Sequence, residues 1–268
     1  MAKKFMSIPQ KSPNEEVSEK LSQVKHKIAV LSGKGGVGKS TVAANLALSF
    51  AEIYPGKVGI CDIDIHGPNI PKILGVEDSP ITTSEDGKPL PAEGPLGLKV
   101  ISMAYFLEST NSPVIWRGPM KMKAIQQFLT DFHWGELEFM IFDLPPGTGD
   151  EALSIMQLIT DLDGVVIVTT PQEVSLLDTG KAVKMAEKMG KPVLGIVENM
   201  SVFECPDCGK KHYIFGQGGG EKLAKEANTK LLGSIPINIS IREKEDIGIS
   251  ESFPEFKVIA KTLLEILQ

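Results

Sequence analysis

The sequence predicts an α/β fold, in which a doubly wound, mostly parallel sheet is flanked by helices. Three observations lead to this prediction. Short apolar runs rich in β-branched residues alternate with helical patterns from Lys27 onward, as in successive βαβ units. The runs are almost continuously apolar, which is typical of strands buried on both faces of a parallel sheet. A glycine-rich stretch joins the first run to the first helical pattern.

Seven expected strands share this near-continuous apolar character. In chain order they are KIAVLS (27–32), KVGICDID (57–64), LKVISM (98–103), FMIFDLP (139–145), GVVIVTTP (164–171), PVLGIVENM (192–200) and KLLGSIP (230–236). Helical patterns are expected at 40–52, 120–132, 153–160, 175–189 and 253–267. Two stretches, 76–97 and 201–220, are rich in turn residues and are expected to be loops.

The length and net charge of the chain limit the number of domains and the kinds of partner that can be expected. The 268 residues contain no evident repeat or second core, so one domain is expected over 26–268. A flexible polar tail is expected over 1–25. Within this tail, residues 14–24 favour a short helix. A net charge of −6 argues against a nucleic-acid partner. No apolar run is long enough to span a membrane, and the N-terminus lacks the apolar core of a secretory signal. A cytoplasmic protein without a membrane partner is therefore expected.

Residues 33–40, GKGGVGKS, fit the phosphate-loop pattern G-x-x-x-x-G-K-[ST]. Backbone N–H groups must converge on a polyphosphate, and glycine can adopt the positive φ angles that this wrap requires. A strand before the loop and a helix after it favour this interpretation over a chance glycine-rich turn. Contacts with the nucleotide, ATP, are expected from Gly33, Lys34, Gly35, Gly36, Val37, Gly38, Lys39, Ser40 and Thr41. Among them, Lys39 is expected on the β- and γ-phosphates and the Ser40 hydroxyl on Mg²⁺.

Two expected strands end in aspartates. Asp62 and Asp64 end the second strand, and Asp143 ends the fourth, just before the glycine-containing loop 146–149. A phosphate loop needs a carboxylate at the tip of a neighbouring strand to hold Mg²⁺ through water, and Asp143 fits that role. The alternative for each aspartate is an acidic cap at a solvent-exposed strand end.

The three cysteines include one close pair, Cys205 and Cys208, in a C-x-x-C spacing that favours metal or redox chemistry in a cytosolic chain. A tetrahedral site needs four ligands, whereas one chain offers this pair, with His212 as a nearby spare ligand and Cys61 in a buried strand. Two chains related by a two-fold axis can supply four thiolates. A structural zinc, a thioredoxin-like redox pair and His212 as a third ligand stay open as alternatives.

The loop form K-G-G-x-G-K-[ST] resembles the deviant Walker A motif of the SIMIBI P-loop ATPases, which include MinD, ParA, the nitrogenase iron protein and the arsenite-type ATPases. The resemblance implies that Lys34 reaches across a two-fold interface to the partner's nucleotide, where a cation stabilises the γ-phosphate charge. It also implies that Asp62 lies near the magnesium ion and that Asp64 orients or activates the attacking water. Asn199 and Pro236 match the family positions that hydrogen-bond and flank adenine.

Several longer blocks closely resemble Mrp/ApbC proteins, the P-loop carriers of iron–sulfur clusters, over about residues 25–268. They are DIDIHGPNIPKILG, WRGPMKMKAIQQFL, DLPPGTGDEALS, ENMSVFECPDCGKKHYIFGQGGGEKLA and LGSIPI. The resemblance implies a homodimeric ATPase in which Cys205 and Cys208 of both chains bridge a labile [4Fe–4S] cluster and pass it to apo iron–sulfur proteins. Zinc is the alternative metal. Residues 1–25 contain no cysteine, so a function tied to a second, N-terminal cluster is not expected.

Two other functions stay open. A MinD/ParA-like positioning ATPase would need a basic amphipathic terminal helix or a basic patch, whereas the expected C-terminal helix carries both signs of charge. An arsenite- or tail-anchor-type ATPase with a structural zinc would need a methionine-rich groove for an apolar client. The 10 methionines are dispersed along the sequence, so no such groove is expected.

Overall fold

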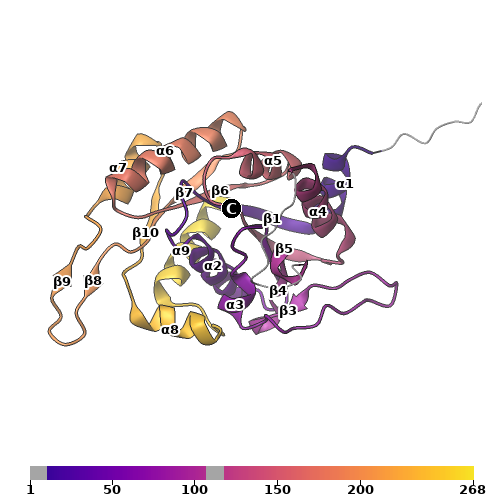
Figure 1. Cartoon of the computed structure of the whole chain (residues 1–268), viewed down its shortest axis with the longest axis horizontal. Coiled ribbons are helices and arrows are strands. Elements are labelled where there is room, and N and C mark those ends of the chain that lie inside the picture. The colour runs from indigo at the N-terminus through magenta and orange to yellow at the C-terminus, as the bar shows by residue number, and fades with distance from the viewer. Residues whose placement is uncertain (1–10, 107–117) are drawn as a thin grey trace, which may run out of the picture.

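A twisted eight-stranded sheet forms the centre of the computed structural model, which describes residues 11–106 and 118–268 (Figure 1). The strand order is β10-β7-β6-β1-β5-β2-β4-β3; β3 pairs antiparallel with β4, and the other neighbouring strands are parallel. The strands are β1 (Val24–Ser32), β2 (Val58–Asp62), β3 (Ala92–Glu93), β4 (Lys99–Ser102), β5 (Leu137–Asp143), β6 (Gly164–Thr169), β7 (Val193–Glu198) and β10 (Leu231–Ser234). A separate hairpin consists of β8 (Phe203–Glu204) and β9 (Lys211–His212).

Helices cover both faces of the sheet (Figure 1). One face carries α2 (Lys39–Ile53), α3 (Ile70–Leu74), α8 (Ile239–Ile247) and α9 (Pro254–Leu267). The other carries α1 (Pro13–Lys20), α4 (Gly118–Asp131), α5 (Asp150–Leu158), α6 (Glu173–Lys188) and α7 (Gly219–Glu226). Successive side chains of a strand point to opposite faces, so Ile28 and Val30 of β1 enter the first core and Ala29 and Leu31 the second.

All seven predicted strands are present, and so are the five helices predicted after residue 39. The stretch 76–97 is mostly loop, as predicted, but it also contains β3 and a 3₁₀ turn, Pro95–Gly97. Helix α8 was not predicted, because its exposed face includes two isoleucines, Ile239 and Ile247, and its apolar period is weak. In the described parts of the chain, no helix has the length and apolar character needed to cross a membrane.

The N-terminal segment differs from the flexible tail expected over 1–25. Residues 1–10 lie outside the described part of the chain, but α1 follows directly, and Ser12 and Glu15 cap it through a reciprocal pair of hydrogen bonds. Val17 and Leu21 are fully buried in the core that α4 and α5 also line. The short helix favoured over 14–24 is therefore present as α1 and a 3₁₀ turn, Leu21–Gln23. The expected flexibility is wrong for residues 13–25, because two apolar side chains one helical turn apart anchor them.

The sheet order places one loop at a special position. β1 lies where the order changes direction along the chain, with β5 on one side and β6 on the other. The carboxyl end of a strand at such a switch point is where open α/β sheets bind ligands. The loop after β1 therefore lies beside the ends of β5 and β2, whose last residues, Asp143 and Asp62, are paired in register.

Candidate functional site

Three glycines shape the loop between β1 and α2, each for a local reason. Gly36 has a φ of +77° and Gly38 a φ of +80°, and side chains rarely tolerate this left-handed conformation. A Cβ at Gly33 would lie 2.3 Å from the backbone of Asp178 in α6. The backbone therefore wraps tightly while the unpaired N–H groups and dipole of α2, which starts at Lys39, face the loop. This arrangement can bind a polyphosphate.

Lys39 and Ser40, the first residues of α2, both contact Asp143 at the end of β5. The Nζ of Lys39 lies 2.6 Å from Oδ1 of Asp143, and the Ser40 hydroxyl donates to Oδ2 at 2.6 Å. Asp143 is fully buried, and Lys39 is 6% exposed. The structure thus brings together the three side chains that the sequence assigns to phosphate and Mg²⁺, and their roles stay predictions.

Asp62 and Asp64 have different surroundings although they are two residues apart. Asp62 is fully buried. The Ser102 hydroxyl and the Ile70 N–H donate to its Oδ2, and the Asp64 N–H donates to its Oδ1. Asp62 therefore holds the chain that leaves β2, and its expected place beside magnesium stays a prediction. Asp64 faces the phosphate loop, because its Oδ2 lies 3.9 Å from the Nζ of Lys39.

The replacement Asp62→Asn should remove a pH-dependent penalty from the folded protein. Burial and the nearby Asp143 raise the pKa of Asp62 to about 8, against the opposing effects of Lys39 and two hydrogen bonds. In the unfolded chain the pKa of an aspartate is about 4. Between these values the folded state binds the extra proton, so this group's contribution to the free energy of unfolding falls as the pH rises.

Asparagine is neutral throughout this range. The free energy of unfolding of the variant, relative to that of the wild type, should therefore increase by about 1–3 kcal/mol as the pH rises from about 5 to about 8. Guanidinium unfolding curves of both proteins across this range measure the difference. A difference that stays constant with pH would mean that Asp62 is already ionised in the folded protein.

Lys34 contacts the residue that precedes α6. Its Nζ lies 3.4 Å from Oε1 of Gln172, and the side chain is partly exposed in the single chain. The loop that follows β5 lies on the same strand end, since the Gly147 N–H donates to the Ser32 carbonyl at 2.9 Å. The predicted reach of Lys34 to a partner's nucleotide stays a prediction.

Asn199 and Pro236 follow the neighbouring strands β7 and β10. The Nδ2 of Asn199 donates to the Val37 carbonyl in the phosphate loop at 2.9 Å, and its Oδ1 accepts the Met200 N–H. Asn199 is buried and Pro236 is half-buried. Asn199 therefore braces the phosphate loop from the side of β7, and the predicted contacts of both residues with adenine stay predictions.

Cys205 and Cys208 lie in the turn of the β8–β9 hairpin, which projects from the body of the molecule (Figure 1). The sequence suggested an irregular loop here. The Cys205 N–H donates to the Lys210 carbonyl at 3.0 Å, and the Gly209 N–H donates to the Cys205 carbonyl at 2.8 Å. These bonds close the turn, with Cys208 exposed and Cys205 partly exposed.

The turn also favours the thiolate form of Cys205. Hydrogen bonds from the backbone N–H groups of Cys208 and Asp207, and from the Cys208 thiol, lower the pKa of Cys205. The thiolate is the form that binds metals. Among the residues that the structure describes, no three His, Cys, Asp or Glu side chains form a group that could hold a metal ion, so His212 is not gathered with the pair. Cys61 is fully buried in β2, as predicted, and burial raises the pKa of its thiol.

A cavity of about 530 Å³ opens beside the phosphate loop and contains residues that the sequence did not single out. Asp64 and His66 line it from the chain after β2, and Glu245 lines it from α8. Glu245 accepts a hydrogen bond from the Thr41 hydroxyl at 3.2 Å, and burial raises its pKa. Its other oxygen is buried without a partner among the described residues. A hydroxyl group of a bound molecule can donate to such a carboxylate.

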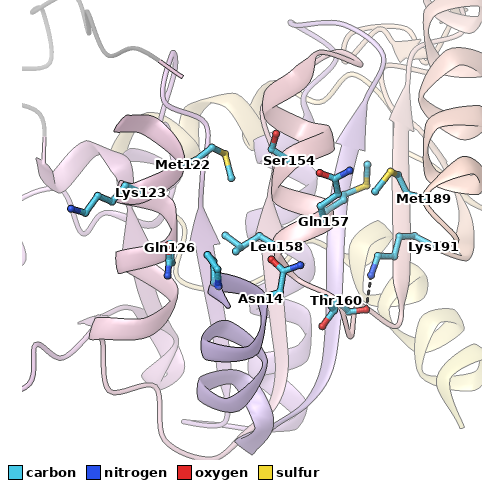
Figure 2. Close-up of a pocket in the computed structure, with 12 residues that line it drawn as sticks. Asn14, Met122, Lys123, Gln126, Ser154, Gln157, Leu158, Thr160, Met189 and Lys191 are labelled. Carbon is cyan, nitrogen blue, oxygen red and sulfur yellow. Dashed lines mark hydrogen bonds between the residues drawn. The ribbon is translucent and has the colours of Figure 1, made fainter. Parts of the chain in front are cut away.

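A larger groove of about 860 Å³ lies between α1, α4 and the second half of α5 (Figure 2). Lys191 closes one end of α5, because its Nζ donates to the carbonyls of Ile159 and Thr160. Three methionines, Met122, Met156 and Met189, line this groove among polar side chains, so it is not the methionine-rich apolar groove that a client-binding ATPase would need. Amides and lysines share the wall (Figure 2), and no carboxylate is among the described residues that line it. The candidate site is therefore the phosphate-loop cavity.

The family described as "ParA: NUBPL iron-transfer P-loop NTPase" matches residues 23–268. A protein of Methanocaldococcus jannaschii named iron-sulfur cluster carrier protein is 51% identical over 256 residues, which cover 93% of this chain and 88% of the relative. A protein of the same name from Saccharolobus solfataricus is 47% identical, covering 94% of this chain and 88% of its own length.

Solved structures also resemble the chain. A nucleotide-binding protein from Archaeoglobus fulgidus, described in complex with ADP and with cobalt, has a TM-score of 0.79 at 40% identity and covers 91% of this chain and 95% of its own. The cell-division ATPase MinD from Pyrococcus furiosus has a TM-score of 0.65 at 24% identity, and the match covers 90% of this chain and 99% of MinD. The second likeness concerns the fold alone.

Proposed function

The chain belongs to the NUBPL iron-transfer P-loop NTPases of the ParA group, and from this membership we propose that it is an ATP-dependent carrier of iron–sulfur clusters. Two chains pair, bind and hydrolyse ATP with Mg²⁺, hold a [4Fe–4S] cluster between them and pass it to apo iron–sulfur proteins. The names of the similar proteins and the ADP complex of the Archaeoglobus fulgidus relative support this proposal. The observation that carries it is the pair of thiols, one exposed and one partly exposed, on a hairpin attached beside the phosphate loop.

The donors around the phosphate loop suit ATP and Mg²⁺. The loop N–H groups and Lys39 supply positive charge for the phosphates, and the Ser40 hydroxyl with Asp143 behind it offers the oxygen ligands that Mg²⁺ prefers. When bound, Mg²⁺ neutralises charge that develops between the β- and γ-phosphates. Asp64 faces Lys39 and is the carboxylate best placed to orient the attacking water.

The cysteine hairpin supplies half of a cluster site. Cys205 and Cys208 are two thiols, whereas a [4Fe–4S] cluster takes four thiolate ligands. A two-fold pair of chains brings two such hairpins together and completes the set. A cluster held at an exposed edge by two ligands from each chain can be released when the chains move apart, which suits a carrier.

Strand β7 links the phosphate loop to the cysteine hairpin. Its last residue, Glu198, is 4% exposed and accepts the Gly220 N–H at the start of α7. The next residue, Asn199, donates to Val37 in the phosphate loop. The segment 201–218, which contains the hairpin, begins just after the contact of Asn199 with Val37. It ends just before the contact of Gly220 with Glu198. A shift of the phosphate loop on nucleotide binding therefore acts on both ends of this segment, and so on the grip of the hairpin.

Mg²⁺ and ATP should accelerate delivery of the cluster. The protein is loaded without oxygen, mixed with an apo-enzyme that needs a [4Fe–4S] cluster, and the recovered enzyme activity is followed in time. Coupling of the two sites should raise the transfer rate about fivefold or more over the rate without nucleotide. Failure to transfer a cluster under any condition would contradict the carrier function. Equal rates with ATP, with ADP and without nucleotide would contradict the coupling through β7.

A further inference from the structure

Three charged or titratable side chains meet at the edge of the phosphate-loop cavity, outside the set assigned above. They are His66, from the chain after β2, Lys121, from the first turn of α4, and Glu151, from the first turn of α5. The Nζ of Lys121 lies 3.1 Å from Nε2 of His66 and 2.5 Å from Oε1 of Glu151. Lys121 is only 8% exposed, and lysine is rarely buried unless it is paired.

The contacts of His66 favour one of its two tautomers. A lysine ammonium can only donate, so its bond to His66 requires a lone pair on Nε2. The Nε2 of His66 is farther from Glu151, at 3.5 Å, than from Lys121, which favours acceptance from Lys121 over donation to Glu151. The bond from Lys121 therefore requires the Nδ1–H tautomer of the imidazole. Partial burial tends to raise the pKa of Glu151, but Lys121 and, to a smaller extent, His66 lower it, so the carboxylate stays charged beside the ammonium.

The imidazole also borders the cavity. His66 lines it together with Lys39 and Asp64. The backbone of His66 is fixed there as well, because its N–H donates to Oδ1 of Asp64 at 3.1 Å. The side chain is 62% exposed, so its Nδ1–H is available to a bound molecule.

We propose that His66, held as the Nδ1–H tautomer by Lys121 and Glu151, donates a hydrogen bond to the terminal phosphate of bound nucleoside triphosphate. The inference rests on the proposed nucleotide function and adds a residue to it. His66 is then a catalytic residue that contacts the substrate. Lys121 and Glu151 are positioning residues, since they act through the imidazole.

The same three side chains join the two acidic strand ends. His66 follows Asp64 by two residues, and Glu151 lies in the helix that begins after the loop from Asp143. Lys121 bonds to both and so ties the two loops to α4. A contact between His66 and the terminal phosphate therefore orders both loops together, which a diphosphate cannot do.

The test compares triphosphate and diphosphate affinity. Calorimetry with Mg²⁺ and either ADP or an ATP analogue with a β,γ-imido bridge is carried out on the wild type and on His66→Ala, Lys121→Met and Lys123→Met. Loss of a hydrogen bond to a charged group should weaken the triphosphate analogue about tenfold in the first two variants. ADP affinity should change by less than about twofold, because the lost contact is with the terminal phosphate alone. Lys123 is an exposed neighbour on α4, and its variant should match the wild type.

Two further readouts separate positioning from general stability. The protein has four histidines, so ¹⁵N-histidine NMR can resolve each, with His66 identified by its loss in His66→Asn. The wild type and Lys123→Met should show protonated Nδ1 at His66, and Lys121→Met should shift the proton toward Nε2. His66→Asn keeps a donor near the Nδ1 position and should restore more triphosphate affinity than His66→Gln.

The outcomes distinguish a failure of the proposed nucleotide binding from a failure of the role of His66. Wild-type protein that binds neither nucleotide would overturn the proposed nucleotide function. Equal weakening of ADP and the triphosphate analogue in His66→Ala, or an unchanged tautomer in Lys121→Met, would overturn the role of His66 while nucleotide binding stands.

Discussion

The replacement Lys34→Ala should remove most ATP hydrolysis while ATP still binds. In the proposed pair, Lys39 and the loop backbone hold the phosphates of their own chain, and Lys34 supplies a cation to the nucleotide of the partner. A cation supplied in this way is worth about 10³-fold or more in kcat, and turnover should fall by about that factor. Phosphate release measures the loss, and calorimetry with ATP measures the retained affinity.

A mixing experiment distinguishes a Lys34 that acts on the partner from one that acts within its own chain. The variants Lys34→Ala and Asp64→Asn should each be inactive alone. A mixed pair has one site with an intact Asp64 and an intact Lys34 from the other chain, so an equal mixture should regain about one quarter of the wild-type rate. A mixture that stays inactive would show that Lys34 serves its own chain.

The double replacement Cys205→Ser/Cys208→Ser should abolish cluster binding. These two cysteines are the ones that solvent reaches, since Cys61 is buried, and serine oxygen is a poor substitute for thiolate sulfur at iron. After anaerobic reconstitution with iron and sulfide, the variant should retain neither ion after desalting and should lose the visible absorption of the cluster. Its nucleotide affinity should stay close to that of the wild type, because the hairpin lies outside the phosphate-loop cavity.

The third cysteine provides the matched control. Cys61 is fully buried in β2, so Cys61→Ala removes one thiol and leaves the hairpin intact. This variant should retain the wild-type amounts of iron and sulfide. Equal retention by the double serine variant and the wild type would rule out the hairpin as the cluster site.

The sequence predicts the sheet and the phosphate loop because both depend on local patterns. Strands buried on both faces must be apolar throughout, so β1, β5 and β6 are visible as continuous runs. Gly36 and Gly38 adopt positive φ, a requirement that the composition of the loop already shows. Asp143 ends a strand that pairs with β1, so its approach to Lys39 follows from the sheet order that a switch point implies.

The features missed by the sequence depend on side chains that converge from distant elements. Lys121 is 55 residues from His66 and 30 residues from Glu151 along the chain. The sequence pattern alone indicates a solvent-exposed lysine on an amphipathic helix. The methionines of the groove in Figure 2 come from α4, from α5 and from the turn after α6. Only the packing of the helices on the sheet brings such groups together. The angle and position at which helices cross cannot be predicted from the apolar period of each helix alone.

The amount of iron and sulfide per chain, measured together with the mass of the same anaerobic sample in solution, tests the central claim most directly. The account predicts four iron and four sulfide ions for every two chains, in a particle of twice the 29.0 kDa chain mass. A particle of one chain mass that holds a complete cluster would contradict it, because one chain presents only the Cys205 and Cys208 thiols to such a site.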